Sequence, residues 1–210
     1  MISVLIADDH NLIREGFRKL IDREPDINLA GEAKNAEELF LILTETQCNV
    51  VVLDISLPDK NGIEVLKDLK IQYPHINVLI LSMHPEERYA SRALKSGASG
   101  YMTKDSASDE LINAVRKVNN GGRYISSALA EQLASTFADE AADTPHTKLS
   151  DREYQVFLLI GEGKTVQEIS ERLSLSVNTI NTYRRRILEK MNVANNADIV
   201  QYALRHRLIE

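Results

Sequence analysis

The stretch VVVLDISLPDKNG, residues 50–62, joins an apolar run to a turn, with one carboxylate between them. The β-branched run Val50–Leu53 suits a strand buried on both faces in the middle of a parallel sheet. Pro58, Asn61 and Gly62 then supply the residue types that turns prefer. Open α/β sheets bind ligands at the carboxyl ends of their strands. Asp54 ends this strand, and because an ionised carboxylate is costly to bury without a partner, it needs neighbours.

The first 120 residues repeat this pattern. Strand-like runs cover residues 3–8, 27–33, 49–54, 76–82 and 99–103. Amphipathic helical segments lie between and after them, at Asn11–Glu24, Ala36–Thr46, Gly62–Tyr73, Glu86–Ser96 and Ala107–Asn119. Five βα units in series predict an α/β doubly wound, five-stranded parallel sheet. We expect the flavodoxin-like strand order 2-1-3-4-5.

After Gly122 the strand pattern ends. Residues 126–138 look helical, residues 138–148 are small, polar and proline-bearing like a linker, and short helices follow from Leu149. Ser150 with Glu153, and Thr165 with Glu168, have the spacing of helix-capping boxes. The sequence therefore predicts a first domain at 1–120, a helical segment and linker at 121–148, and a small all-α helix-turn-helix domain at 149–210.

Composition narrows the class of protein. The 210 residues are 43% hydrophobic, which is enough for one good core and a smaller second one. A single cysteine, Cys48, excludes an internal disulfide framework and is expected to be a packed thiol without redox chemistry. No apolar run has the length of a membrane span, and the first residues lack a signal-peptide pattern, so we expect a cytoplasmic protein.

Charge is divided unevenly along the chain. The net charge is −6 overall, −5 over residues 1–120 and +1 over residues 149–210. The acidity therefore belongs to the predicted sheet domain, and the predicted helical domain is close to neutral. The five histidines show no transition-metal ligand spacing. His10 and His84 adjoin the carboxylate site, whereas His75, His146 and His206 are predicted at the surface.

A group of polar side chains should meet Asp54 at one sheet edge. Asp8 and Asp9 end the first predicted strand, which neighbours the third in this strand order. Three carboxylates repel each other, and a hard divalent cation such as Mg²⁺ offsets their charge through oxygen ligands. Ser82 and Lys104 end the fourth and fifth strands and would complete a phosphoryl site, with Asp54 as the nucleophile. Each residue alone would be an ordinary strand-end or solvated side chain.

A basic helix is predicted at residues 177–191, after Ser176 as its cap. Ile180, Ile187 and Met191 mark its inner face by their spacing. Its other faces carry Asn178, Asn181, Thr182, Glu189, Lys190 and the triplet Arg184, Arg185 and Arg186. Asparagine and arginine read base edges in the major groove, although the same pattern also occurs on a solvated face of a small bundle.

Four motifs give the chain a family resemblance. LIADDH, VVVLDISLP followed by NG, LILSMH and SGASGYMTK occur in the order and spacing of receiver domains. The chain resembles the two-component response regulators of the NarL/FixJ group, which carry a LuxR-type helix-turn-helix. This resemblance implies that Asp54 accepts a phosphoryl group, and that Asp9, Asp54 and the Ser56 carbonyl bind Mg²⁺ while Asp8 holds a metal-bound water. It also implies switch roles for Ser82 and Tyr101, and phosphate binding by Lys104.

The resemblance further implies a non-enzymatic transcription regulator. Its partners would be a sensor histidine kinase, promoter DNA with paired half-sites, and a second copy of the chain. The implied DNA contacts are Lys164, Asn178, Asn181, Thr182, Arg184 and Arg185. The chain departs from many receivers in having Asp105, where a proline is common, and the bulky Met83 after the switch hydroxyl.

Two other classes of function compete with this one. A phosphatase of the haloacid dehalogenase type also forms an aspartyl phosphate on a doubly wound sheet. That class needs an acid two places after the nucleophile, and Ser56 occupies that place here. A regulator whose second domain binds RNA or protein would keep the same first domain, and a shift assay comparing DNA with RNA distinguishes it.

Overall fold

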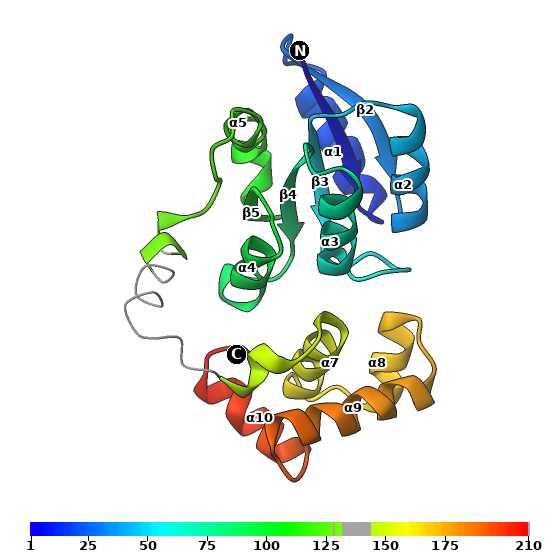
Figure 1. The fold of residues 1–210 in the computed structure, drawn as a ribbon, viewed down its shortest axis with the longest axis vertical. Coiled ribbons are helices and arrows are strands. Elements are labelled where there is room, and N and C mark those ends of the chain that lie inside the picture. The colour runs from blue at the N-terminus through cyan, green and yellow to red at the C-terminus, as the bar shows by residue number, and fades with distance from the viewer. Residues whose placement is uncertain (128, 132–143, 210) are drawn as a thin grey trace. The chain divides into compact units, whose positions relative to one another are not determined.

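The computed structural model describes residues 1–127, 129–131 and 144–209. The chain divides into two compact units, Met1–Leu133 and Ala134–Glu210, each of which has its own fold (Figure 1). None of the described helices is long and apolar enough to cross a membrane.

The first unit is built on a five-stranded parallel sheet. Its strands are β1 (Ile2–Ala7), β2 (Ile27–Ala33), β3 (Val50–Asp54), β4 (Asn77–Ser82) and β5 (Gly100–Thr103). They lie in the order β2-β1-β3-β4-β5, which confirms the predicted topology. All five residues of β3 are buried, as expected of a central strand covered on both faces.

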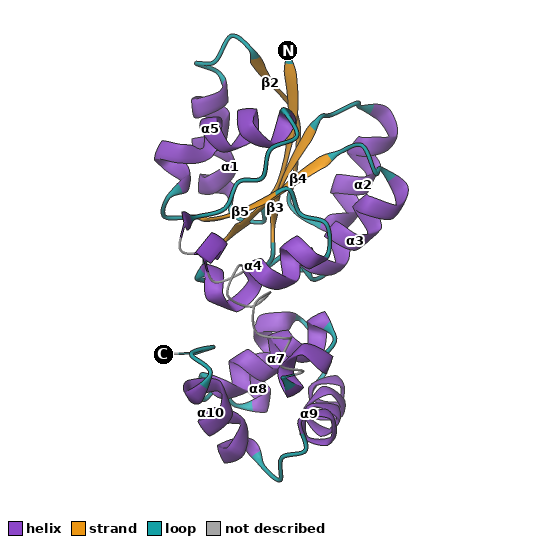
Figure 2. Ribbon diagram, turned by 60° about the vertical axis from the view of Figure 1, so that its left-hand side comes forward, coloured by secondary structure: helices purple, strands orange, loops and turns teal. Residues whose placement is uncertain are grey.

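Helices cover both faces of this sheet, as Figure 2 shows. They are α1 (Asn11–Ile21), α2 (Ala36–Glu45), α3 (Gly62–Gln72), α4 (Glu86–Lys95) and α5 (Ala107–Asn119). Side chains alternate between the faces of a strand, so each strand contributes to two cores. On the α1 and α5 face, Phe17, Leu111 and Val115 pack on Val4, Val52 and Leu81.

The outer edge of β5 is closed by one residue of the following segment. Tyr124 forms an isolated parallel bridge with Gly100, donating its N–H to the Ser99 carbonyl at 3.0 Å and accepting from the Tyr101 N–H at 2.9 Å. A Cβ on Gly100 would lie 2.6 Å from the Tyr124 carbonyl oxygen, so only glycine permits this approach. Tyr124 therefore fixes where the chain leaves the sheet.

Over its described residues, 144–209, the second unit contains a short 3₁₀ helix and four α-helices. They are η1 (Pro145–Lys148), α7 (Asp151–Gly161), α8 (Val166–Leu173), α9 (Val177–Met191) and α10 (Asn196–Arg205). Both predicted capping boxes are present, at Ser150 with Glu153 and at Thr165 with Glu168, and Ser176 caps α9. Ile180, Ile187 and Met191 are buried, which confirms the predicted inner face of α9.

An ion pair between the buried Glu153 and the exposed Lys190 ties the start of α7 to the end of α9. The Glu153 side chain is 3% exposed, and its Oε2 accepts from the Lys190 Nζ at 2.6 Å and from the Ser150 N–H at 2.8 Å. Burial acts to raise the pKa of Glu153, but these hydrogen bonds outweigh it and hold the pKa below its ordinary value. Glu153 therefore caps one helix and anchors another.

The segment between the units holds the predicted helix and the predicted linker. The predicted helix at 126–138 falls mostly outside the described residues, although 127 and 129–131 are helical. Within the predicted linker, Pro145–Lys148 forms a 3₁₀ helix. The prediction of a surface His146 is wrong because this helix holds the ring half-buried, with Nδ1 2.8 Å from the Tyr202 hydroxyl.

Candidate functional site

The carboxyl ends of β1, β3 and β5 bring two aspartates and one lysine together. Ala7 pairs with Leu53, so Asp8 follows at the level of Asp54, and Lys104 follows the last residue of β5. The Lys104 Nζ lies 2.7 Å from the Oδ2 of Asp8 and 2.7 Å from the Oδ2 of Asp54. These three side chains are at most 3% exposed. The predicted convergence is therefore present in the folded chain.

This cluster carries more negative than positive charge. Burial raises the pKa of Asp54, the Lys104 ammonium opposes that rise, and the Asp8 carboxylate reinforces it. Burial would lower the pKa of Lys104, but the two carboxylates more than offset it and raise the pKa. Lys104 therefore stays protonated, and its single charge faces two buried carboxylates and the nearby Asp9.

The same edge has the donor set of a hard divalent cation. Asp8, Asp9, His10 and Asp54 each offer a ligand atom, and these atoms lie within 4.8 Å of one another. The Oδ2 of Asp8 is buried and accepts no hydrogen bond of good geometry, although Lys104 is near. Three carboxylates against one ammonium leave two negative charges, the charge that one Mg²⁺ ion offsets. The acidic pocket is thus compatible with Mg²⁺.

His10 makes close contacts with two carboxylates of this cluster. Its Nδ1 lies 2.7 Å from the Oδ1 of Asp9 and 3.1 Å from the Oδ1 of Asp8, which also accepts the His10 N–H at 2.8 Å. The ring is 59% exposed, so it borders the solvent side of the carboxylates. An imidazole is a poor ligand for a hard cation beside carboxylates, which makes His10 a neighbour of the site.

The loop after Asp54 folds back tightly on the end of β3. The Gly62 N–H donates to the Ile55 carbonyl at 2.8 Å, and the Asn61 side chain accepts from the Ile63 N–H to cap α3. A Cβ on Gly62 would lie 2.3 Å from the Asp54 carbonyl oxygen. The start of α3 therefore packs directly against the backbone of Asp54.

Asp59 ties the same loop to a second helix. Its two carboxylate oxygens accept from the N–H groups of Ala36 and Glu37 at 3.0 and 3.1 Å, and Asn35 caps the next N–H, that of Glu38. Three of the donors that a helix start leaves unpaired are thereby satisfied at α2. Within the loop, the Ser56 N–H donates to the Oδ1 of Asp54 at 3.0 Å. Because Lys104 donates to Oδ2, both oxygens of the Asp54 carboxylate are hydrogen-bonded.

Ser82 and Tyr101 are both buried and share one backbone neighbour. The Ser82 Oγ accepts from the His84 N–H at 3.0 Å, and the Tyr101 hydroxyl donates to the His84 carbonyl at 2.9 Å. The sequence placed His84 beside the site without indicating this contact. Met83, which lies between Ser82 and His84 in sequence, is 64% exposed. The β4–α4 segment therefore links the hydroxyls of Ser82 and Tyr101 through its backbone.

In the second unit, the predicted DNA contacts have different surroundings. The exposed residues of the set are Lys164, Asn178, Asn181, Thr182 and Arg185. Arg184 is half-buried, and its Nε donates to the Asn196 side chain of α10 at 2.6 Å. Arg185 makes a loose ion pair with Glu189, at 3.8 Å between exposed side chains. The exposed side of α9 is therefore polar and carries exposed cations, while Arg184 is half-buried and contacts α10.

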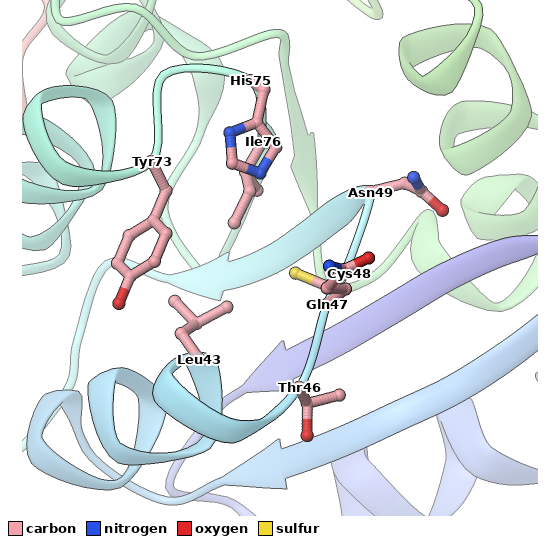
Figure 3. A pocket seen from close by; sticks show the side chains of 8 residues that line it. All are labelled: Leu43, Thr46, Gln47, Cys48, Asn49, Tyr73, His75 and Ile76. Carbon is pink, nitrogen blue, oxygen red and sulfur yellow. The ribbon is translucent and has the colours of Figure 1, made fainter.

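Cys48 lies away from this chemistry, at the opposite edge of the sheet. It lines a pocket of about 400 Å³, with Leu43 from α2 and with Tyr73 and Ile76 from the segment after α3 (Figure 3). Burial raises the pKa of the thiol to about 11. The thiol is therefore protonated at neutral pH, consistent with the packed cysteine that the sequence predicts.

Both units match family models. Residues 4–116 match the response regulator receiver domain, and residues 147–203 match the bacterial regulatory proteins of the luxR family. Among curated proteins, the response regulator UvrY of Escherichia coli K12 is 35% identical over 99% of this chain and 96% of its own length. The response regulator GacA of Pseudomonas aeruginosa is 36% identical, covering 100% of this chain and 99% of its own.

Solved structures also match along nearly the whole chain. RcsB of Salmonella enterica serovar Typhimurium, bound to the promoter rprA with the phosphomimetic BeF3⁻, has a TM-score of 0.66 and 26% identity, covering 96% of this chain and 98% of its own. A structure of two RcsB dimers bound to two parallel DNAs has a TM-score of 0.60 and 25% identity, with 97% and 98% coverage.

The charge imbalance predicts that Asp54→Asn stabilises the protein in the absence of metal. Because the folded pKa of Asp54 lies above its ordinary 3.8, its ionisation opposes folding as the pH rises through the acid range. At neutral pH the variant should gain about 0.5–2 kcal/mol in urea unfolding with EDTA, and the gain should shrink toward acid pH. The exposed Asp105→Asn serves as control and should change stability by less than about 0.5 kcal/mol. A variant less stable than wild type at neutral pH would contradict the imbalance.

The close approach at Gly62 predicts that Gly62→Ala destabilises the first unit. The new methyl group would overlap the Asp54 and Ile55 backbone, and the overpacking should cost about 1–3 kcal/mol in urea unfolding. Gly16→Ala is the matched control, because Gly16 lies within α1 and an added Cβ would meet no atom within 4 Å apart from its chain neighbours and the local backbone of its own helix. That change should stabilise the protein by about 0.5–1 kcal/mol. Equal effects of the two substitutions would argue against a tight loop at Asp54.

Proposed function

Because this chain belongs to the response regulators that join a receiver domain to a LuxR-family DNA-binding domain, we propose that phosphorylation of Asp54 controls its binding to promoter DNA. The proposal assigns the receiver to residues 1–120, the connecting segment to 121–148 and DNA binding to 149–210. The phosphoryl donor is a sensor histidine kinase, and the active form is a homodimer. The proposed location is the cytoplasm, where a bacterial regulator meets DNA.

One observation carries the proposal. A buried lysine, Lys104, is held between two buried aspartates at the edge of the sheet where ligands bind. When Asp54 is phosphorylated, negative charge moves from its carboxylate to the phosphoryl oxygens. An ammonium in this position can then hydrogen-bond to one of those oxygens. The proposed Mg²⁺ ligands are Asp9, Asp54 and the Ser56 carbonyl, with Asp8 acting through a bound water. Bound there, the ion would offset the negative charge of the transferring phosphoryl group.

In the proposed transfer, an Asp54 carboxylate oxygen attacks the phosphorus of the donor. A new O–P bond forms as the bond from phosphorus to the donor nitrogen breaks, and the electron pair leaves with that nitrogen. Lys104 stays protonated throughout and hydrogen-bonds the phosphoryl oxygens. The Ser56 N–H donates to the Oδ1 of Asp54. The other oxygen, Oδ2, which accepts a hydrogen bond from Lys104, is therefore the oxygen proposed to bond to phosphorus.

The proposed switch runs through His84. A phosphoryl group on Asp54 offers the proton of the Ser82 hydroxyl a charged acceptor, and rotation of this side chain toward it weakens the hydrogen bond that its Oγ accepts from the His84 N–H. The His84 carbonyl is the partner of the Tyr101 hydroxyl, so a shift of this backbone also frees Tyr101. Phosphorylation thereby biases an existing equilibrium between two arrangements of the β4–α4 segment.

For DNA, the proposed reader is α9. Its exposed Asn181, Thr182 and Arg185 are the proposed major-groove contacts, and the exposed Asn178 and Lys164 are proposed as further DNA contacts. Arg184, which is bonded to Asn196, is assigned to a phosphate near the helix flank. A net charge of +1 over residues 149–210 makes nonspecific binding weak, so dimerisation supplies affinity by joining two half-sites. An RNA-binding output remains the second candidate in the assay below.

The phosphorylation proposal predicts one labelled aspartate. Incubation with Mg²⁺ and a small-molecule phosphodonor should add one phosphoryl group, measured by intact mass, and Asp54→Asn should abolish it. Asp9→Asn should weaken labelling strongly because it removes a proposed metal ligand. Asp59→Asn is the control: it changes an acid of the same loop that caps α2, and it should leave one phosphoryl group. Labelling of Asp54→Asn at the wild-type level would overturn the assignment of Asp54 as the acceptor.

The DNA proposal predicts unequal effects of two arginines on α9. Arg185→Ala should weaken binding by about 1–3 kcal/mol and relax preference at one base pair if its guanidinium reads guanine. Arg184→Ala should weaken all sequences alike and lower the salt slope by roughly one unit. Binding to operator variants and to RNA of matched length, at two salt concentrations, separates these effects. Wild-type affinity in both variants, or preference for RNA, would exclude α9 as a promoter reader.

A further inference from the structure

A polar pocket lies at the edge of the sheet opposite Asp54. It has a volume of about 220 Å³ and is formed where β4 and β5 begin, by Lys70, Asn77, Gly97, Ser99, Gly121 and Arg123 among others. Its residues come from the end of α3, the α4–β5 turn and the segment that leaves α5. Two of them are cations, and no residue lining the pocket is acidic.

The two cations of this pocket lack carboxylate partners among the described residues. The Lys70 Nζ donates to the Ile76 carbonyl at 2.6 Å, and the Arg123 Nη1 donates to the Ala98 carbonyl at 3.3 Å. Elsewhere in the same acidic unit, Arg14, Arg18 and Arg116 all pair with carboxylates. An ammonium has three donors and a guanidinium five, so most of the donors of both groups remain for a ligand.

The surroundings hold Lys70 in place, whereas Arg123 is exposed and is positioned by its hydrogen bond to the Ala98 carbonyl. Lys70 is half-buried, and a Cβ on Gly97 would lie 3.2 Å from its Cγ, so the α4–β5 turn packs along the lysine stem. Burial lowers the pKa of Lys70, and the nearby Arg123 charge lowers it further. The Ser99 hydroxyl, which donates to the Asn77 side chain at 3.1 Å, adds a neutral polar group. Two like charges brought together in this way are stabilised by an anion between them.

We propose that this pocket binds a small molecule carrying a phosphate group, with Lys70 and Arg123 as its charged contacts. A phosphate monoester carries a charge of about −1.5 to −2 at neutral pH, which matches two cations, whereas a carboxylate carries one charge. Guanidinium groups bind phosphate oxygens in a fork, and lysine adds a point charge. The volume is below the roughly 300–1,000 Å³ of drug-sized ligand sites, so the ligand is small.

The position of the pocket connects this ligand to the start of the interdomain segment. Gly121 and Arg123 immediately precede Tyr124, which pairs with the edge of β5. A bound phosphate would hold the segment at 121–123 against the α4–β5 turn. The ligand therefore acts on the first residues that lead to the second unit, at the edge of the sheet away from Asp54.

The test is a titration of the full, ¹⁵N-labelled chain in metal-free buffer with EDTA. Inorganic phosphate and glycerol 2-phosphate are added in separate arms, and sodium chloride at matched ionic strength forms the third. We expect saturable amide shifts at Gly97, Ser99, Gly121 and Gly122 in a phosphate arm, and no such shifts with chloride. Saturation by both phosphates identifies the phosphate group as the determinant, and saturation by glycerol 2-phosphate alone shows that the organic part also contacts the pocket.

Variants decide whether the two cations are responsible. Lys70→Met and Arg123→Gln should each weaken binding by at least about tenfold, the effect of losing one charge-assisted hydrogen bond. Lys67→Met, one turn earlier on α3 and outside the pocket, should bind like wild type. Amide spectra of each variant establish whether it is folded. If Lys70→Met does not fold, the surface substitution Arg123→Gln still tests the site. Shifts that follow ionic strength alone, or wild-type binding by a folded Arg123→Gln, would overturn the site.

Discussion

The Lys104 ammonium, fixed 2.7 Å from both Asp8 and Asp54, is the interaction on which the first unit is arranged. It joins the ends of β1, β3 and β5, although β4 lies between the last two. Buried carboxylates are tolerable only with such a partner, so the sheet must bring the three strand ends to one level. The remaining negative charge keeps the pair reactive toward cations. The arrangement of the strand ends and the attraction of cations therefore depend on the same contact, in which the carboxylates outnumber the ammonium.

Around this contact, the neighbouring loops each carry out one task. Asp59 and Gly62 fix the loop after Asp54 to α2 and to the backbone of β3. In the β4–α4 segment, the His84 N–H donates to the Ser82 Oγ and the His84 carbonyl accepts from the Tyr101 hydroxyl. The first loop thus holds the Asp54 carboxylate in position, and the β4–α4 segment joins two buried hydroxyls through one backbone.

Much of this architecture follows from local sequence patterns. The five strands, their helices and both capping boxes are predictable because hydrophobic period and cap residues are short-range signals. The convergence of Asp8, Asp54 and Lys104 follows from strand order, which the family resemblance supports. The contacts of Asp59 with α2 and of His84 with Tyr101 have no comparable signal, because they join residues 17 or more positions apart through backbone groups. The half-burial of His146 has no local signal either, because the Tyr202 hydroxyl that its ring contacts is 56 residues away.

The Glu153–Lys190 pair has a consequence for the cost of recognition. It fixes the end of α9 to the capped start of α7, and Ser150, Glu153 and Lys190 are joined through one carboxylate oxygen. The helix is therefore oriented when the domain folds, before it meets a partner. Preorganisation of this kind moves the loss of conformational entropy from association to folding, so contacts made by the exposed side of α9 contribute more fully to affinity and dissociation is slower.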